Sequence, residues 1–289
     1  MRGRLLVADA GAGMLTAYDA RTLRPIARRA VEGAGALCAW GGDVMCAAEG
    51  EGGILRLDGN TLAVRQRLPA GPGIRALRVG ADGLCLYALA GDADSVLLLD
   101  GESGAPQVLA RVGVQPRNMA LDSVGNTLAV AGGADCCVYL LRGDTLATLA
   151  RIDVDGVAVS VAFAPGALWV LCAVGQEDLA TSLLRVQPGS GKIERRLDME
   201  GMPGGLLALP DAGVVVGLLD GMAYVARHAK RVGWRVALDG ALPDSAAHAG
   251  RHVFWADGLG GCVWALDWPS ARMRPCLQAL QEPVAVLLI

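Results

Sequence analysis

The chain has 289 residues, which is long for one domain, although closed all-β architectures reach this length as a single unit. Its formal net charge is −3 and its densest basic stretch is 227-RHAKR-231, so the electrostatic signature of a nucleic-acid binder is missing. The eight cysteines form no C-x2-C pairs and have no neighbouring histidines, which argues against zinc and favours buried thiols.

The first residues have the charged start of a signal peptide but not its apolar region. In 1-MRGRLLVADAG-11 the apolar run is interrupted by Asp9 after a few residues, which is too short for export. We therefore expect a cytoplasmic protein. The stretch 37-LCAWGGDVMCA-47 follows and predicts a hairpin. If its turn centres on Gly42, Cys38 and Cys46 face each other, and whether they pair stays open.

Strand-like runs that end in a polar residue recur along the whole chain. Their last residues are 19, 58, 100, 142, 187, 227 and 267, which are 39 to 45 residues apart. The third unit shows the internal order of each repeat: strands at 74–79, 84–90, 95–100 and 107–114, joined by turns rich in Gly and Asp. Seven four-stranded antiparallel meanders predict an all-β, seven-bladed β-propeller.

Two other features of the chain fit this architecture. The uncharged stretch 157-VAVSVAFAPGALWVLCAV-174 is divided by Pro165-Gly166, which predicts a buried hairpin and not a membrane-spanning helix. The adjacent Cys136 and Cys137 would point to opposite faces of a strand, which argues against joint metal ligation. We find no amphipathic helical pattern of useful length.

The C-terminal run 283-PVAVLLI-289 is wholly apolar, whereas chain ends are usually solvated. The first unit begins directly with a second-strand pattern, 4-RLLVAD-9, so its innermost strand is missing. We expect residues 283–289 to supply it, so that the ring closes and no sheet edge stays open there. The chain is then one propeller domain, 1–289, whose first blade combines 1–31 with 283–289.

The repeats resemble a known family. The unit 95-SVLLLDGESGAPQVLARVGVQPRNMALDSVGNTLAVAGGAD-135 is similar to the YVTN-type repeat of YncE-like propellers, and 55–94 keeps a similar register. Residues 242–261 keep the strand order but lose the Asp-Gly turn. The resemblance implies a WD40-like repeat platform for ligands or proteins, and some propeller relatives are lactonases that act on sugar lactones.

Antiparallel alternation places two sets of loops at one mouth of the central channel: those that lead into the first strands and those that join second to third strands. The first set includes 71-GPGIR-75, 115-QPRNM-119, 201-GMPGG-205, 242-LPDSA-246 and 281-QEP-283. Arg75 and Arg117 hold near-equivalent positions and could clamp a carboxylate or phosphate, with Asn118 and Glu282 nearby. The alternative is that the arginines are solvated or pair with neighbouring acids.

The second set of loops contributes at least one acid in every unit. These are Asp9, Glu49, Asp92 with Asp94, Asp135, Glu177 with Asp178, Asp220 and Asp257. A ring of carboxylates could bind a divalent cation or attract a basic partner. Asp beside Gly is also what tight turns require, so the acids could be turn residues alone. We commit to no metal and no other cofactor, and keep Asp9, Glu49 and Asp220 as weak metal candidates.

Enzymatic function has little support in the sequence. Lactone hydrolysis needs a metal or oxyanion donor and a group that activates water. Carboxylates are present, but His228, His248 and His252 form no catalytic pattern, and 201-GMPGGL-206 lacks the helix of a phosphate loop. Trp264 is expected in the core, and Trp268 near a loop, beside Arg272 and Arg274, as a weak protein interface.

We therefore expect a non-enzymatic, monomeric propeller that binds a protein or small ligand at one channel mouth, with no nucleic acid or membrane partner. The ligand-binding candidates are Arg75, Arg117, Asn118, Asp92, Asp135, Asp257 and Glu282. A metal-dependent, lactonase-like hydrolase and a structural module of a larger assembly are the alternatives.

Overall fold

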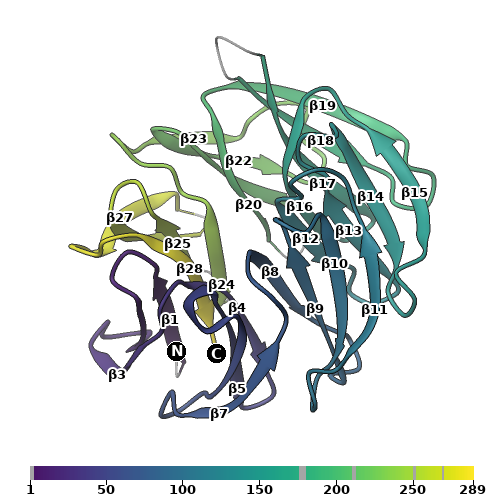
Figure 1. Ribbon diagram of the computed structural model, residues 1–289. Coiled ribbons are helices and arrows are strands. Elements are labelled where there is room, and N and C mark those ends of the chain that lie inside the picture. The colour runs from purple at the N-terminus through teal and green to yellow at the C-terminus, as the bar shows by residue number, and fades with distance from the viewer. Residues whose placement is uncertain (1–2, 176–179, 210–212, 250–251, 269) are drawn as a thin grey trace.

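Short apolar strands and tight polar turns fold the chain into seven four-stranded antiparallel sheets arranged as a ring (Figure 1). The computed structural model describes residues 3–175, 180–209, 213–249, 252–268 and 270–289. Each sheet is one blade, and the chain runs through it from the innermost to the outermost strand. The prediction of a seven-bladed β-propeller is confirmed.

The strands of the first four blades, from the channel outward, are β28 (Pro283–Leu288), β1 (Arg4–Asp9), β2 (Met14–Asp19) and β3 (Pro25–Ala30); β4 (Ala34–Trp40), β5 (Asp43–Ala48), β6 (Gly53–Asp58) and β7 (Val64–Pro69); β8 (Ile74–Val79), β9 (Cys85–Ala90), β10 (Ser95–Asp100) and β11 (Pro106–Arg111); and β12 (Asn118–Leu121), β13 (Thr127–Ala131), β14 (Cys137–Arg142) and β15 (Thr148–Asp153).

The strands of the last three blades are β16 (Val157–Ala164), β17 (Ala167–Val174), β18 (Ala180–Val186) and β19 (Ile193–Glu200); β20 (Pro203–Leu209), β21 (Gly213–Leu218), β22 (Gly221–Ala226) and β23 (Trp234–Ala237); and β24 (Ser245–Ala249), β25 (His252–Asp257), β26 (Cys262–Asp267) and β27 (Arg272–Leu277). The described residues contain one short 3-10 turn, η1 (Glu49–Glu51), and no helix long and apolar enough to cross a membrane.

The expected strands of the third blade agree closely with the observed ones, except that the outermost strand is Pro106–Arg111 and not 107–114. The uncharged stretch 157–174 is the hairpin β16–β17, and Gly166 in its turn has φ 73°, a left-handed conformation that glycine adopts without steric cost. Turn chemistry and apolar runs therefore locate the strands well in this part of the chain.

Ring closure depends on the pairing of β28 with β1. Leu5 lies opposite Leu288 and Val7 opposite Val286 in an antiparallel register. The Arg4 amide donates to the Ile289 carbonyl at 2.8 Å, and the Ile289 amide donates back at 3.1 Å. The C-terminal strand is thus the innermost strand of the N-terminal blade, as the apolar ending indicates.

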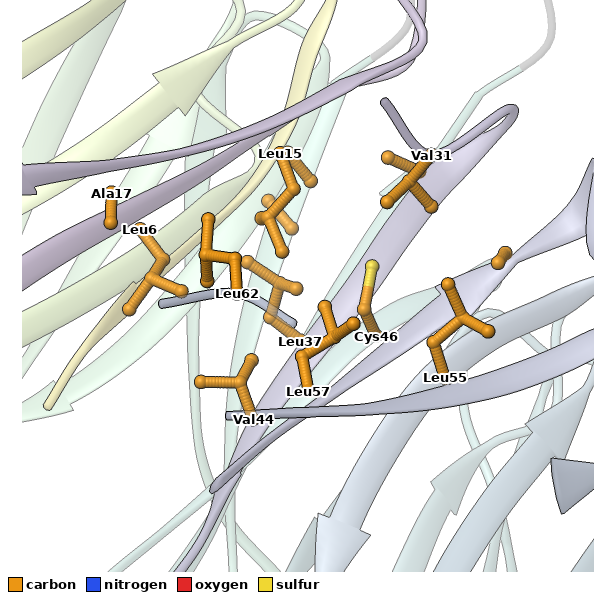
Figure 2. Packing of buried hydrophobic residues seen from close by; sticks show 14 residues of the cluster. Leu6, Leu15, Ala17, Val31, Leu37, Val44, Cys46, Leu55, Leu57 and Leu62 are labelled. Atoms are coloured by element: carbon orange, nitrogen blue, oxygen red, sulfur yellow. The ribbon is translucent and has the colours of Figure 1, made fainter. Parts of the chain in front are cut away.

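The core lies between neighbouring blades. One cluster fills the space between the first and second blades, where Leu6, Leu15 and Val31 contact Leu55 and Leu57 of the next sheet (Figure 2). All five side chains are at most 1% exposed. Full burial of a Leu or Val side chain stabilises a fold by about 1.5–3 kcal/mol. Because this surface comes from two sheets, each blade needs its neighbours.

The two cysteines of the first predicted hairpin do not face each other. Leu37, not Cys38, lies opposite Cys46, because Trp40 pairs with Asp43 and the turn is the two-residue step Gly41-Gly42 instead of a turn centred on Gly42. Side chains of adjacent residues point to opposite faces of a strand, and Cys38 packs in the interface with the third blade while Cys46 packs in the interface with the first. Both thiols are free, and burial raises the pKa of each to about 12. Both cysteines are therefore unreactive at neutral pH, because the thiol and not the thiolate is the favoured form.

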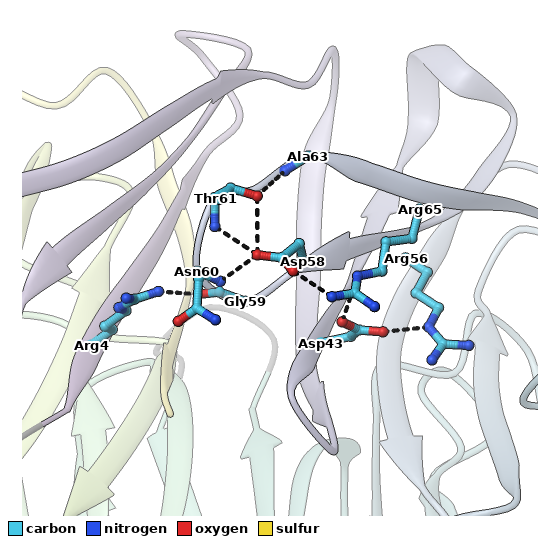
Figure 3. A network of polar contacts seen from close by, with 9 residues as sticks. All are labelled: Arg4, Asp43, Arg56, Asp58, Gly59, Asn60, Thr61, Ala63 and Arg65. Carbon is cyan, nitrogen blue, oxygen red and sulfur yellow. Dashed lines mark hydrogen bonds and ion pairs between the residues drawn. The ribbon is translucent and has the colours of Figure 1, made fainter.

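A polar network supports the second blade at the end opposite the channel mouth described below. Figure 3 shows Arg65 between the carboxylates of Asp43 and Asp58, while Arg56 donates to Asp43 at 2.6 Å. Asp43 is 5% exposed, so two guanidinium groups compensate a nearly buried charge. Arg4 of β1 donates to the Gly59 carbonyl at 2.6 Å, which ties the closed first blade to its neighbour.

Removal of residues 283–289 should unfold the ring or lower its melting temperature by about 10 °C or more, because β1 loses its partner and two blade interfaces lose apolar contacts. Circular dichroism during heating measures this. The control is Ile289→Ala, which removes only a side chain that is 39% exposed and should shift melting by less than about 2 °C. A truncated chain that melts within about 2 °C of the full chain would contradict the closure.

Candidate functional site

The two sets of loops predicted for one mouth do lie together. Backbone hydrogen bonds join them within blades: Gly91 donates to Gly73 at 3.0 Å, Glu49 to Gly33 at 3.2 Å, and Ala10 to Glu282 at 2.9 Å. Each bond links a loop between second and third strands to the loop that leads into an innermost strand. The channel mouth is therefore a ring of paired loops.

The channel encloses a cavity of about 1230 Å³. Its wall is made by small residues of the innermost strands, including Ala36 and Ala39 of β4 and Ala246 of β24. Ligand pockets of proteins are typically about 300–1,000 Å³, so the space suffices for a small molecule. The charged residues that line it are Glu49, Arg75, Arg78, Asp92, Arg117, Asp244 and Glu282.

The innermost strands are irregular where they leave the mouth. Pairing shifts in β28, β4, β8, β16 and β20, and each shift lies near the mouth end of its strand. In β8 the shift falls between Ile74 and Ala76, so Arg75 is the extra residue. Bulges of this kind re-aim side chains and are frequent beside binding sites. The Arg75 side chain is accordingly half exposed at the mouth.

Arg75 is paired, whereas Arg117 is not. Arg75 contacts Asp92 at 2.9 Å, and both side chains are about half exposed, at 50% and 58%. A side chain at Gly91 would collide with the Arg75 guanidinium, so that glycine leaves room for the pair. Among the described residues, Arg117 has no ion pair or side-chain hydrogen bond, although it lines the same channel from the loop before β12. Asn118 accepts a hydrogen bond from the Val161 amide at 3.4 Å.

Four of the predicted acids accept hydrogen bonds from backbone amides and do not line the channel. Asp9 accepts from the Gln281 and Glu282 amides at 3.0 and 2.8 Å, and Asp257 accepts from the Leu242 amide at 3.0 Å. Asp94 and Asp220 accept from loop amides of Gln115 and Gly240. In each case a carboxylate fastens a loop that leads toward an innermost strand. Asp257 is fully buried and also accepts from Trp264.

The remaining predicted acids have different positions. Asp135 accepts from the Tyr139 hydroxyl at 2.9 Å and does not line the channel. Glu49 and Glu282 do line it, and both are exposed. Glu177 and Asp178 lie outside the described residues. Among the residues that are described, no group of three or more His, Cys, Asp or Glu side chains is placed to hold a metal ion.

Two charged residues that line the channel, Asp244 and Arg78, were not among the predicted site residues. Asp244 lies in the loop before β24, and burial raises the pKa of its carboxyl to about 7, with Asp257 and Glu282 adding to the rise. Its side chain is nevertheless open to the channel. Arg78 is half-buried on β8, where it donates to the Leu77 carbonyl at 2.7 Å, and burial lowers the pKa of its guanidinium. A charged residue within an apolar innermost strand is the signal that could have indicated Arg78.

Two other sequence features have structural explanations. The glycines of 201-GMPGG-205 allow close approach between blades, because a side chain at Gly205 would collide with the Asp244 carbonyl. Trp268 is half-buried and not exposed, since it packs on Tyr224 with ring centroids 4.2 Å apart and lies beside Trp234. The aromatic residues therefore join the sixth and seventh blades.

Comparison with known proteins supports the fold alone. No family model matches the sequence, and no curated protein matches it. A protein of unknown function from Desulfotomaculum acetoxidans superposes with a TM-score of 0.83 over 99% of this chain and 98% of its own, at 10% identity. The designed protein Ika8 gives 0.74, at 15% identity, over 99% of this chain and 90% of its own. Hydrazine synthase of Kuenenia stuttgartiensis gives 0.71, at 17% identity, over 79% and 74%.

Replacement of Asp257 by alanine should cost about 3 kcal/mol of folding free energy, because several buried donors lose one charged acceptor. The matched variant Asp92→Ala should cost less than about 1 kcal/mol, since it removes an exposed ion pair. Urea unfolding of both variants measures the difference. Equally small losses of unfolding free energy in both variants would contradict the role of Asp257 as the acceptor that holds its loops in place.

The raised pKa of Asp244 predicts a pH-dependent stability. The folded state favours the protonated carboxyl, so this group contributes an instability that grows as pH rises from the unfolded value of 3.8 to the folded value of about 7. Asp244→Asn should melt like the wild type near pH 4 and on the order of 1–3 °C higher near pH 8, since channel water screens part of the effect.

Melting curves of Asp244→Asn across this pH range provide the measurement. In the Glu282→Gln background the gain should shrink, because a neighbouring negative charge is gone. A gain that is constant with pH, or larger at pH 4 than at pH 8, would contradict the assignment.

Proposed function

We propose that this propeller is a non-enzymatic binding module that takes a small ligand with a carboxylate or phosphate group at the channel mouth. The single observation that supports this function is Arg117, an exposed guanidinium on the channel wall without a partner among the described residues. A guanidinium presents donors in a fork that matches carboxylate and phosphate oxygens.

The surroundings of Arg117 favour an anion further. Arg75 lies at the mouth on the adjacent innermost strand β8, and Arg78 lies on the same strand within the channel. The pair of Arg75 with Asp92 is exposed, and such pairs contribute little, so Arg75 can turn to a ligand at small cost. The proposal requires neither nucleic acid nor a membrane, and a monomer suffices.

We also propose that the chain is a divergent relative of YVTN-type, YncE-like propellers. The support is the match between the repeat 95–135 and the observed order β10, β11, β12 and β13, together with the polar step after each third strand. That step has a physical role in the structure: Asp58 and Asp100 accept from the amides of Thr61 and Ser103, which closes the outer turn.

The lactonase-like alternative has one supporting observation. Asp244, with a pKa of about 7 in the channel, could take a proton from water near neutral pH. Polarisation of the lactone carbonyl needs a metal or an oxyanion donor as well, and no cation site is formed by the described carboxylates and histidines. We therefore prefer a binding function to lactone hydrolysis.

Titration calorimetry at low ionic strength, with inorganic phosphate and glutarate as probes, tests the binding function. We expect at least one probe to bind, and Arg117→Gln to weaken it about tenfold or more, as loss of a charge-assisted hydrogen bond does. The matched control Arg111→Gln changes an exposed arginine of the outer strand β11 and should leave affinity within about twofold. No binding by either probe, or equal losses in both variants, would overturn the function.

A further inference from the structure

The charges on the channel wall are separated by sign. The innermost strands follow one another around the ring as β28, β4, β8, β12, β16, β20 and β24 (Figure 1). The arginines that line the channel lie on β8 and before β12. Asp244 and Glu282 lie before β24 and β28, which are also neighbours. Glu49, directly after β5 of the second blade, also lines the channel, so acids follow one another over the seventh, first and second blades. Asp92 lies beside the arginines and is paired with Arg75, and β16 and β20 separate the two arcs on the other side.

Apart from the pair of Arg75 with Asp92, the charges of the two arcs have no ion-pair partner among the described residues. Asp244 and Glu282 have no ion-pair partner among the described residues, although both line the cavity. Arg78 donates only to a carbonyl, and Arg117 has no side-chain partner in the described part of the chain. The buried Asp43 differs, since it is paired with both Arg56 and Arg65.

Like charges on one arc repel each other and favour an opposite charge between them. Asp244 shows this effect, since Glu282 contributes to its raised pKa. An anion alone would satisfy the arginine arc and leave the acidic arc unpaired, and a cation alone would do the reverse. A molecule with both charges satisfies both arcs at once.

We propose that the ligand of this channel is a small zwitterion, with its carboxylate at Arg117 and Arg78 and its ammonium group at Asp244 and Glu282. A short apolar chain between the two groups would lie against the alanine-rich wall of β4 and β24. This inference rests on the proposed function and adds to it the second, cationic end of the ligand.

Three probes of equal chain length separate the possibilities: δ-aminovalerate, glutarate and cadaverine. In titration calorimetry at low ionic strength, we expect δ-aminovalerate to bind at least about fivefold more tightly than glutarate and cadaverine. The shorter γ-aminobutyrate and the longer ε-aminocaproate are included so that one zwitterion matches the span between the arcs.

Single substitutions test which residues bind the carboxylate and which bind the ammonium group of the zwitterion. Glu282→Gln should weaken the best zwitterion about fivefold or more while leaving glutarate unchanged or tighter, and Arg117→Gln should weaken both. The matched control Glu102→Gln alters an exposed acid in the turn after β10, away from the channel, and should change neither.

Two results would overturn the inference in different ways. If glutarate binds as tightly as every zwitterion and Glu282→Gln weakens none of them, the zwitterion is wrong and the anion-binding function stands. If no probe binds, or cadaverine alone binds, both proposals fail. A zwitterion preference that survives Glu282→Gln and Asp244→Asn together would also overturn the assignment of the cationic end.

Discussion

Closure of the ring is the constraint on which the rest of this structure depends. A four-stranded blade has two apolar faces and can bury them only against two neighbours, so the core is distributed over the interfaces between blades. An open ring would leave two such faces and one inner strand edge in water. The pairing of β28 with β1 removes these at once, and it joins the two most distant parts of the sequence within one sheet.

The same closure determines where chemistry can occur. Because each blade begins at the channel, all loops that lead into innermost strands gather at one mouth, and buried or turn-bound carboxylates such as Asp9 and Asp257 hold them in place. Those acids are occupied by backbone amides. The charges left for a ligand are the ones that no loop requires: Arg117, Arg78, Glu49, Asp244 and Glu282. Acidic residues thus have two separate roles: Asp9 and Asp257 stabilise the loops, whereas Asp244 and Glu282 stay available to a ligand.

The sequence predicted the strands, the blade number and the closing strand, because period-two burial and Gly/Asp turns are local signals repeated seven times. It could not separate Asp257 from Glu282, since their roles depend on which amides a loop from elsewhere in the chain brings near. The error over Cys38 and Cys46 has a local cause: the hairpin turns over Gly41-Gly42 and not about Gly42, and this one-residue difference replaces Cys38 by Leu37 opposite Cys46. Asp244 was overlooked because its raised pKa comes mainly from burial, which the folded ring creates and the local sequence does not show.

Solved structures share this fold at 10–17% identity, so very different sequences build the same kind of ring. The innermost strands pack some side chains between blades, as Leu37 of β4 and Leu77 of β8 do, and turn one edge with a few other side chains to the cavity. Residues at that edge can change sign, size or pairing without altering the ring. Function in such a protein therefore has to be argued from the innermost strands. In this chain the innermost strands and the loops that lead into them carry opposite charges on two arcs of one cavity, and that arrangement is independent of the repeat that builds the fold.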